Sequence, residues 1–157
     1  MNKNSHNENI DFINQQIIAM LSTDGRIAYS EIAKELKISN SLVHQRVRKL
    51  QEAGIISGFS VMLNAKEIGY ETITYTGVTT KEARFAYSIA EKLKEIPEVV
   101  ECHFVSGKYA LFLKIVAANN EEFRKVLYEK IHNIEGVGGT DSFISFGSAF
   151  QKNVTLL

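Results

Sequence analysis

The chain has 157 residues, of which 45% are hydrophobic and 23% charged, and its 18 basic side chains are balanced by 18 acidic ones. Zero net charge excludes a uniformly basic protein that coats nucleic acid, and a single cysteine excludes an internal disulfide and a cysteine-rich zinc site. No run of 18 apolar residues and no signal-peptide pattern is present. We therefore expect a cytoplasmic protein of one or two small domains.

The chain opens with a polar segment, residues 1–9, which is expected to be a disordered tail. Asp11 is then placed to cap a helix whose apolar side chains recur on one face. Those side chains are Ile13, Ile17, Met20 and Leu21. The sequence Asp-Gly-Arg at 24–26 predicts the turn that ends this helix.

Residues 29–56 contain two short helical patterns separated by a break that is too short for a long loop. The apolar stripes are Ile32, Ala33 and Leu36 in the first helix and Val43, Val47 and Leu50 in the second. Ser30 and Ser39 are each placed to cap a helix start. This arrangement predicts a helix-turn-helix, whose second helix is short enough to lie in the major groove of DNA.

The outer face of the second helix carries hydrogen-bonding and cationic side chains. At about 100° per residue, the side chains that lie opposite the apolar stripe and would face base edges are Ser41, His44, Gln45 and Arg48. The side chains expected to hold phosphate or the helix itself are Ser39, Asn40, Arg46 and Lys49. Arg46 lies near the apolar stripe, so an internal ion pair is its alternative role. A solvated face is the alternative for the whole set, but the local positive charge favours DNA.

Gly54 is placed to end the second helix. Residues 55–61 are consistent with a short strand, which would form a wing beside DNA, or with a segment packed against the helices. Residues 62–71 are expected to be a linker. The predicted domains are therefore a DNA-binding domain at 10–61 and a second domain at 72–157.

The second domain alternates between strand and helix patterns. The predicted strands are 72–79, 99–106, 109–117 and 140–148, and the predicted helices are 81–95 and 120–134. Gly107 and Lys108 form the expected hairpin turn, and Gly136 to Gly139 a flexible loop into the last strand. The order βαββαβ is that of a ferredoxin-like unit. Both helices should cover one sheet face. The expected side chains of the other face are Phe104, Phe112 and Val116, with Ile144 and Phe146 depending on register. An uncovered apolar face predicts a partner, most simply a second copy.

These pieces, in this order and spacing, resemble the Lrp/AsnC family of leucine-responsive and asparagine regulators, from about Ile10 to the C-terminus. The residues that carry the resemblance are Asp24-Gly25-Arg26, the stretch 39–50, Gly54-Ile55-Ile56, Glu101-Cys102-His103, Val105-Ser106-Gly107 and Gly136-Val137. The resemblance implies an α+β protein with a winged helix-turn-helix and a ferredoxin-like domain. It further implies a sequence-specific transcription regulator of amino-acid or related metabolism, which dimerises, often into octamers, and binds a small effector between dimers near the hairpin turn.

The chain departs from the family pattern at three places. Asn14 stands where the family often has a second aspartate in the first helix. Lys37 stands where a turn glycine is common. The effector-lining residues that the resemblance implies are Gly107, Lys108, Tyr109, Ala110, Thr140 and Ser142. Amino-acid binders of the family usually have an aspartate at position 108, at 110 or at both, where a carboxylate can hold an ammonium group. Lys108 would suit an anionic metabolite better. Ordinary turn and strand surface is the alternative for these residues.

The sequence offers no catalytic constellation, and neither a metal ion nor a cofactor is expected. Cys102 and His103 are neighbours on a strand, so they point to opposite faces and cannot act on one substrate. The four histidines show no metal-ligand spacing. Two alternatives to a regulator are an enzyme subunit resembling sirohaem decarboxylase and a metabolite sensor without DNA binding. The base-reading face argues against both.

Overall fold

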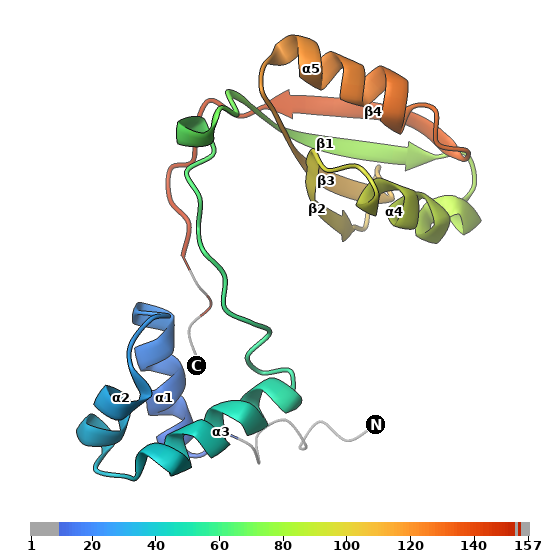
Figure 1. Ribbon diagram of the computed structural model, residues 1–157. Coiled ribbons are helices and arrows are strands. Elements are labelled where there is room, and N and C mark those ends of the chain that lie inside the picture. The colour runs from blue at the N-terminus through green and yellow to red at the C-terminus, as the bar shows by residue number, and fades with distance from the viewer. Residues whose placement is uncertain (1–9, 153, 155–157) are drawn as a thin grey trace. The chain divides into compact units, whose positions relative to one another are not determined.

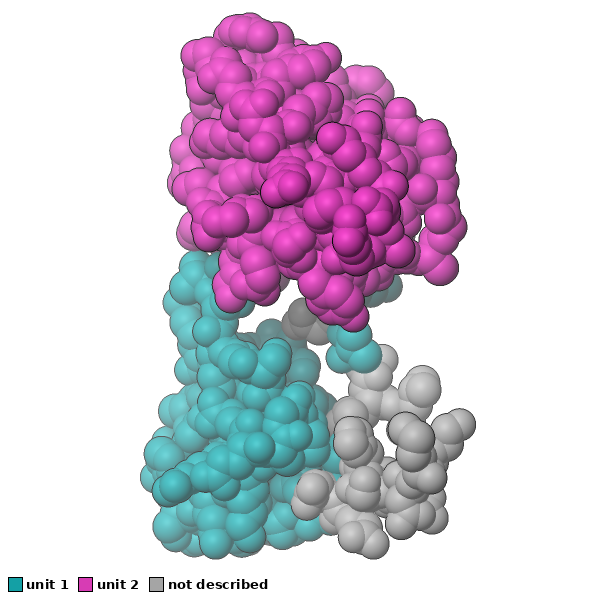
Figure 2. All heavy atoms as spheres, turned by 90° about the vertical axis from the view of Figure 1, so that its right-hand side faces the viewer, with its two compact units in different colours: residues 1–61, 151–157 teal, residues 62–150 magenta. Residues whose placement is uncertain are grey.

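The computed structural model describes residues 10–152 and 154. The tail expected at 1–9 lies outside the described residues. The chain divides into two compact units, residues 1–61 with 151–157 and residues 62–150 (Figure 2). Each unit is described by itself below.

The first unit is built from helices α1 (Phe12–Thr23), α2 (Tyr29–Leu36) and α3 (Asn40–Glu52) (Figure 1). One apolar face of each helix packs into a shared core. Its buried side chains are Ile17, Leu21, Ile32, Ala33, Val43, Val47 and Leu50. The predicted stripes therefore form the core, and the helix-turn-helix is present.

The helix starts differ from prediction at one of the two serines. Asp11 accepts from the Asn14 backbone N–H at 2.8 Å, and Ser39 Oγ accepts from Leu42 N–H at 3.2 Å. The prediction that Ser30 caps α2 is wrong. The helix begins at Tyr29, and Ala28, two residues before Ser30, takes the extended N-cap conformation without a side-chain bond. Ser30 is therefore already inside the first turn.

The corner between α2 and α3 is made by Lys37. This residue ends α2 in the left-handed conformation, with φ 54° and ψ 42°. Ile38 N–H then donates to Ala33 O at 3.0 Å, which closes the helix end. A non-glycine residue in this conformation costs roughly 1–2 kcal/mol. The short corner between α2 and α3 is therefore formed with local backbone strain at Lys37.

Gly54, with φ 70°, ends α3. The backbone N–H groups of Ile55 and Ile56 both donate to Leu50 O, and both side chains pack on the helical core. Of the two predicted alternatives for this segment, packing against the helices holds for these two residues. Residues 57–64 form neither helix nor strand.

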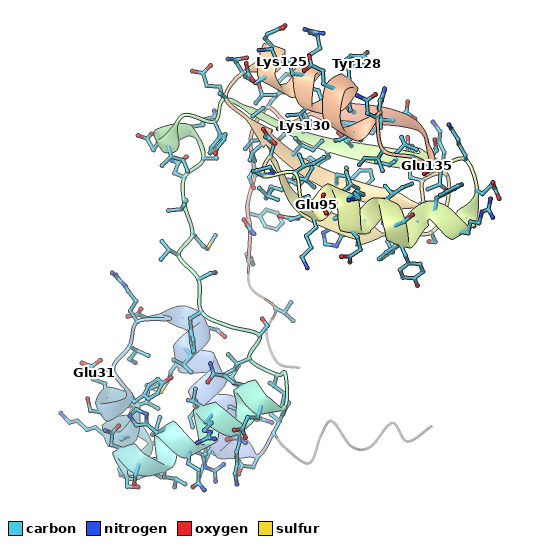
Figure 3. The ribbon with its side chains drawn as sticks, turned by 45° about the vertical axis from the view of Figure 1, so that its right-hand side comes forward. Glu31, Glu95, Lys125, Tyr128, Lys130 and Glu135 are labelled. Atoms are coloured by element: carbon cyan, nitrogen blue, oxygen red, sulfur yellow. The ribbon has the colours of Figure 1, made fainter. Side chains whose placement is uncertain are left out.

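The second unit is a four-stranded antiparallel sheet in the order β2-β3-β1-β4 (Figure 1). The strands are β1 (Thr72–Thr80), β2 (Val99–Phe104), β3 (Leu111–Ala117) and β4 (Val137–Ile144). The helical segments are η1 (Lys66–Ile68), η2 (Ala83–Phe85), α4 (Ala86–Lys94), α5 (Asn120–Lys125) and η3 (Val126–Ile131), the last of π type. Side chains of α4 and η3 share one buried core with β3, so the helices cover one sheet face, as predicted. Lys130 of η3, labelled in Figure 3, binds Glu98 at 2.7 Å.

The last strand begins three residues earlier than predicted. Positions 136–139 are not a flexible loop, because Val137 and Gly139 pair with β1 across a bulge. Gly136 has φ 91°, and a Cβ there would lie 2.3 Å from the Phe85 ring. Gly136 and Gly138 therefore allow close packing against η2 and β1, respectively.

The sheet face that the helices leave uncovered was predicted only in part. Phe112 and Val116 alternate with the buried residues of β3, so they lie on this open face as expected. Phe104 does not, because it pairs with Leu111 on the helix side and contacts Tyr87 at 4.9 Å between ring centroids. A bulge after Val99 sets this register.

The last strand supplies a different side chain from the one expected. Ile144 pairs with the buried Thr74, so it also lies on the helix side. Phe143 pairs with Tyr75 on the open face instead, and Phe146 lies beyond the end of β4. The open face is defined here by the apolar side chains of Ile73, Tyr75, Phe112, Val116 and Phe143.

Candidate DNA-binding surface and effector region

The outer face of α3 is solvent-exposed along its length. Val43, Val47 and Leu50 are buried, which turns the opposite side of the helix outward. The side chains predicted to read base edges are all exposed, namely Ser41, His44, Gln45 and Arg48. These are donors and acceptors of the kinds that bind base edges in the major groove. The geometry thus offers one continuous polar face on a helix of groove-compatible length.

Arg48 is a cation on this face, and 80% of its side chain is exposed. Its Nε donates to Glu52 Oε1 at 2.8 Å, one helical turn away. Pairs of this type stabilise a helix by only about 0.2–0.5 kcal/mol. Arg48 can therefore exchange Glu52 for a base edge or phosphate at small cost.

Arg46 is held inside the unit. Its guanidinium donates to Asp11 Oδ2 at 2.6 Å and to Asn14 Oδ1 at 3.0 Å, and its side chain is 22% exposed. The Asn14 backbone N–H and the Arg46 guanidinium lower the pKa of the Asp11 carboxyl. The internal ion pair left open as an alternative is thus the arrangement that the structure contains, and it fastens α3 to the start of α1.

The flanks of α3 hold the remaining predicted DNA contacts. Ser39 Oγ lies 3.0 Å from Ser41 Oγ and also caps the helix. Asn40 and Lys49 are exposed. A hollow of about 270 Å³ between α1 and α3 is lined by Lys49, Gln45 and Arg46 among others.

The region predicted to bind an effector contains an ion pair that joins the β2–β3 hairpin to β4. Lys108 Nζ lies 2.6 Å from Asp141 Oδ2, and the Tyr109 hydroxyl donates to the same oxygen at 3.0 Å. To reach it, Tyr109 crosses Gly77 of β1, where a Cβ would lie 2.6 Å from the ring. Gly77 is therefore the position that lets the tyrosine lie flat across the sheet.

Two of the six predicted effector-lining residues lie on the opposite face. Thr140 pairs with Val78 and lies 2.7 Å from His132 Nε2, while Ser142 lies 2.9 Å from Thr76 Oγ1 under the helices. Asp141, between them, faces Tyr109. Side-chain alternation along the strand already implied that Asp141 faces away from Thr140 and Ser142. The strand register was needed to tell which of the two faces carries Asp141. Gly107, with φ 112°, makes the turn, and Ala110 N–H donates to Val78 O.

The Lys108–Asp141 pair changes the electrostatics expected of the hairpin. Asp141 and, to a smaller extent, Tyr109 raise the pKa of the Lys108 ammonium. Lys108 and, to a smaller extent, Tyr109 lower the pKa of the Asp141 carboxyl. Lys108 is therefore not an isolated cation. A carboxylate is present beside the hairpin after all, supplied by β4 rather than by the turn.

The residues considered for catalysis are not assembled into a site. Cys102 pairs with Leu113 on the helix side and His103 with Phe112 on the open side, and burial raises the pKa of the Cys102 thiol. Within residues 10–152 and 154 there is no group of three His, Cys, Asp or Glu side chains that could hold a metal ion. Over the same described residues, none of the helices has the length and apolar character to cross a membrane.

Comparison with known proteins places both units. Residues 11–57 match the model of a winged helix-turn-helix DNA-binding domain, and residues 74–154 match that of the Lrp/AsnC ligand-binding domain. The regulatory protein AsnC of Haemophilus influenzae is 32% identical over 93% of this chain and 97% of its own length.

Solved structures give the same result. The structure of Escherichia coli AsnC superposes with a TM-score of 0.85 at 30% identity, over 92% of this chain and 97% of that one. A feast or famine regulatory protein of Mycobacterium tuberculosis, solved with L-methionine, gives a TM-score of 0.83 at 26% identity over 90% and 95%. With its helix-turn-helix followed by the matching ligand-binding domain, the chain belongs to the Lrp/AsnC family and is a DNA-binding transcription regulator.

Proposed function

We propose that this regulator acts as a cytoplasmic homodimer that inserts two α3 helices into half-sites about one helical turn apart on a partly palindromic operator. The observation that carries the proposal is the exposed polar face of α3, with Ser41, His44, Gln45 and Arg48 turned away from the core. Ser39, Asn40 and Lys49 would hold phosphate at its flanks. Arg46 would brace the helix through Asp11 rather than touch DNA.

The open face supports the pairing of two copies. Tyr75 is 39% exposed and Phe143 57% exposed, and the two are paired across β1 and β4. Phe112 and Val116 add apolar side chains on β3, on either side of Lys114. Apolar sheet surface of this kind is stable when a second sheet packs on it. Further association of dimers into octamers would follow from contacts outside this face.

An α-amino acid is the effector that the hairpin supports best. Asp141 offers a carboxylate for an ammonium group, and Lys108 offers an ammonium group for a carboxylate, within 2.6 Å of each other. A zwitterion is complementary to both charges. The related M. tuberculosis regulator solved with L-methionine supports this class. Lys108 alone had suggested an anion, and its pairing with Asp141 changes that proposal. Binding would act by shifting the population of oligomers.

The test is binding of the purified protein to DNA from upstream of its own gene, against a scrambled sequence, at fixed near-physiological salt. We expect a preference for the natural sequence that is lost when Gln45 and Arg48 are both replaced by alanine. Arg84→Ala, which removes an exposed cation from the other unit, is the matched control and should bind as the parent does. Equal binding of natural and scrambled DNA across a panel of amino acids would reject the proposed reading face.

A further inference from the structure

A tyrosine outside the recognition helix contacts its base-reading face. Tyr29 is the first residue of α2 and packs partly into the helical core, whereas His44 is exposed on α3. The two ring centroids lie 4.7 Å apart, with an interplanar angle of 71°. This is the edge-to-face geometry in which aromatic rings attract each other.

The same tyrosine also borders the groove-facing surface of α3. A hollow of about 480 Å³ is walled by Tyr29, His44, Gln45, Arg48 and Gln51, with the buried Val47 at its base. Three of these walls are side chains proposed to face DNA. Tyr29 is therefore part of the outer surface, although it belongs to the bracing helix.

An exposed histidine ordinarily samples several ring orientations, and ordering it on a ligand lowers the affinity. A ring held in one orientation before binding avoids part of that loss. Tyr29 can hold the ring in this way because its own position is fixed by the core and by the start of α2. The neighbouring Arg48 takes part in neither of the cation–π contacts of the described residues.

We propose that Tyr29 is a positioning residue for His44, and that the pair sets sequence specificity at one base pair of each half-site. His44 would donate a ring N–H to an acceptor on a purine edge in the major groove, N7 or the guanine O6. Tyr29 would act through His44 without touching the base. The inference rests on the proposed placement of α3 in the groove.

The experiment measures binding of the full chain to operators changed one base pair at a time, by fluorescence anisotropy at fixed salt. His44→Ala should abolish discrimination at one position of the half-site. Tyr29→Leu, which keeps an apolar side chain but removes the ring, should reduce discrimination at that same position five- to tenfold and leave binding to random DNA unchanged. Tyr29→Phe keeps the ring and should retain discrimination within about twofold. The double variant Tyr29→Leu/His44→Ala should be no worse than His44→Ala.

An NMR measurement keeps the test valid if the leucine variant does not fold. The ring protons of His44 should carry a ring-current shift that persists in Tyr29→Phe and is lost in Tyr29→Met. Equal weakening of all DNA sequences by Tyr29→Leu, or additive effects in the double variant, would overturn the positioning role. An operator preference that survives His44→Ala at every position would also overturn it, while leaving the proposed function intact. Loss of preference in the parent protein would instead reject the proposed function.

Discussion

The two proposed binding regions of this protein are built in different ways. The proposed DNA-reading face comes from one helix, so the spacing of His44 and Arg48 along the chain already places them side by side. The hairpin region comes from separate segments, because Tyr109 crosses Gly77 of β1 to reach Asp141 of β4. The first region depends on local periodicity, whereas the second depends on sheet register.

The largest effect on stability is expected at Gly77, where the Tyr109 ring leaves no room for a side chain. Gly77→Ala places a Cβ 2.6 Å from the Tyr109 ring. We expect a loss of about 1–3 kcal/mol in the free energy of unfolding, because overpacking forces the ring aside. Urea unfolding measures it. Gly139→Ala on β4 is the control, since its Cβ would be 3.5 Å from Thr79 Oγ1, an ordinary contact. Equal stability of the two variants would show that Tyr109 does not depend on the glycine.

Substitution on the outer face of α3 should lower the affinity for DNA and leave the stability of the fold unchanged. Arg48→Ala removes a fully outward cation whose only pairing in the described structure is with the exposed Glu52. Operator binding should weaken by about 1–3 kcal/mol if Arg48 reads a guanine, with an unchanged unfolding midpoint. Fluorescence titration against operator and scrambled DNA gives both affinities. An unchanged operator affinity would remove Arg48 from the reading set.

A smaller effect is expected where α3 is fastened to α1. Asp11→Asn keeps a residue suited to capping but removes the charge facing Arg46. We expect a loss of about 0.5–1 kcal/mol at neutral pH, near the low end because Asp11 is half exposed. The folded-state pKa of Asp11 is lowered. This stabilisation is therefore complete above the unfolded pKa, near 4, and is lost as the pH falls through the folded pKa.

Unfolding of both proteins at pH 6 and at pH 3 tests the sign. The difference between parent and Asp11→Asn should shrink at the lower pH. A difference that grew on acidification would contradict the assigned ion pair. Arg46→Ala should show a similar loss of stability. A much larger loss of operator affinity in Arg46→Ala than in Asp11→Asn would return Arg46 to the DNA contacts.

The smallest effect on stability, with a clear effect on function, is expected at Asp141. The pair with Lys108 is exposed, so Asp141→Asn should leave the unfolding midpoint in place while the pKa of Lys108 falls toward its ordinary value. An amino-acid-dependent change in assembly, followed by light scattering, should be lost. Glu82→Gln, which neutralises an exposed carboxylate paired with Arg84, is the control. If assembly still responds to the amino acid in Asp141→Asn, the Asp141 carboxylate does not bind the effector.

Helix α3 illustrates what could be predicted. Val43, Val47 and Leu50 repeat at helical spacing, and this fixed both the core face and the outward side chains. Ser30 illustrates the limit of the same reasoning, because a cap depends on where the backbone turns extended, and that happens at Ala28. The sequence left Arg46 with two possible roles, a phosphate contact or an internal ion pair. The position of Asp11 in the structure decides for the ion pair.

The strands show the opposite balance. Their order and the single covered face followed from the sequence pattern. The side of Phe104 and Ile144 did not, because a bulge or a shift of one residue in pairing reverses every side chain beyond it. For the same reason, the sequence pattern wrongly grouped Thr140 and Ser142 with the hairpin residues, and it did not identify Asp141.

The sequence by itself determined the helix-turn-helix, the set of exposed polar residues on α3 that we propose to read bases, the βαββαβ order and the family, because these depend on periodicity and spacing within short stretches. The tertiary structure alone decided the Arg46–Asp11 brace, the Tyr29–His44 contact and the Lys108–Asp141 pair. Each of these joins residues from different elements, and their distance is set by how the elements pack and not by their separation along the chain.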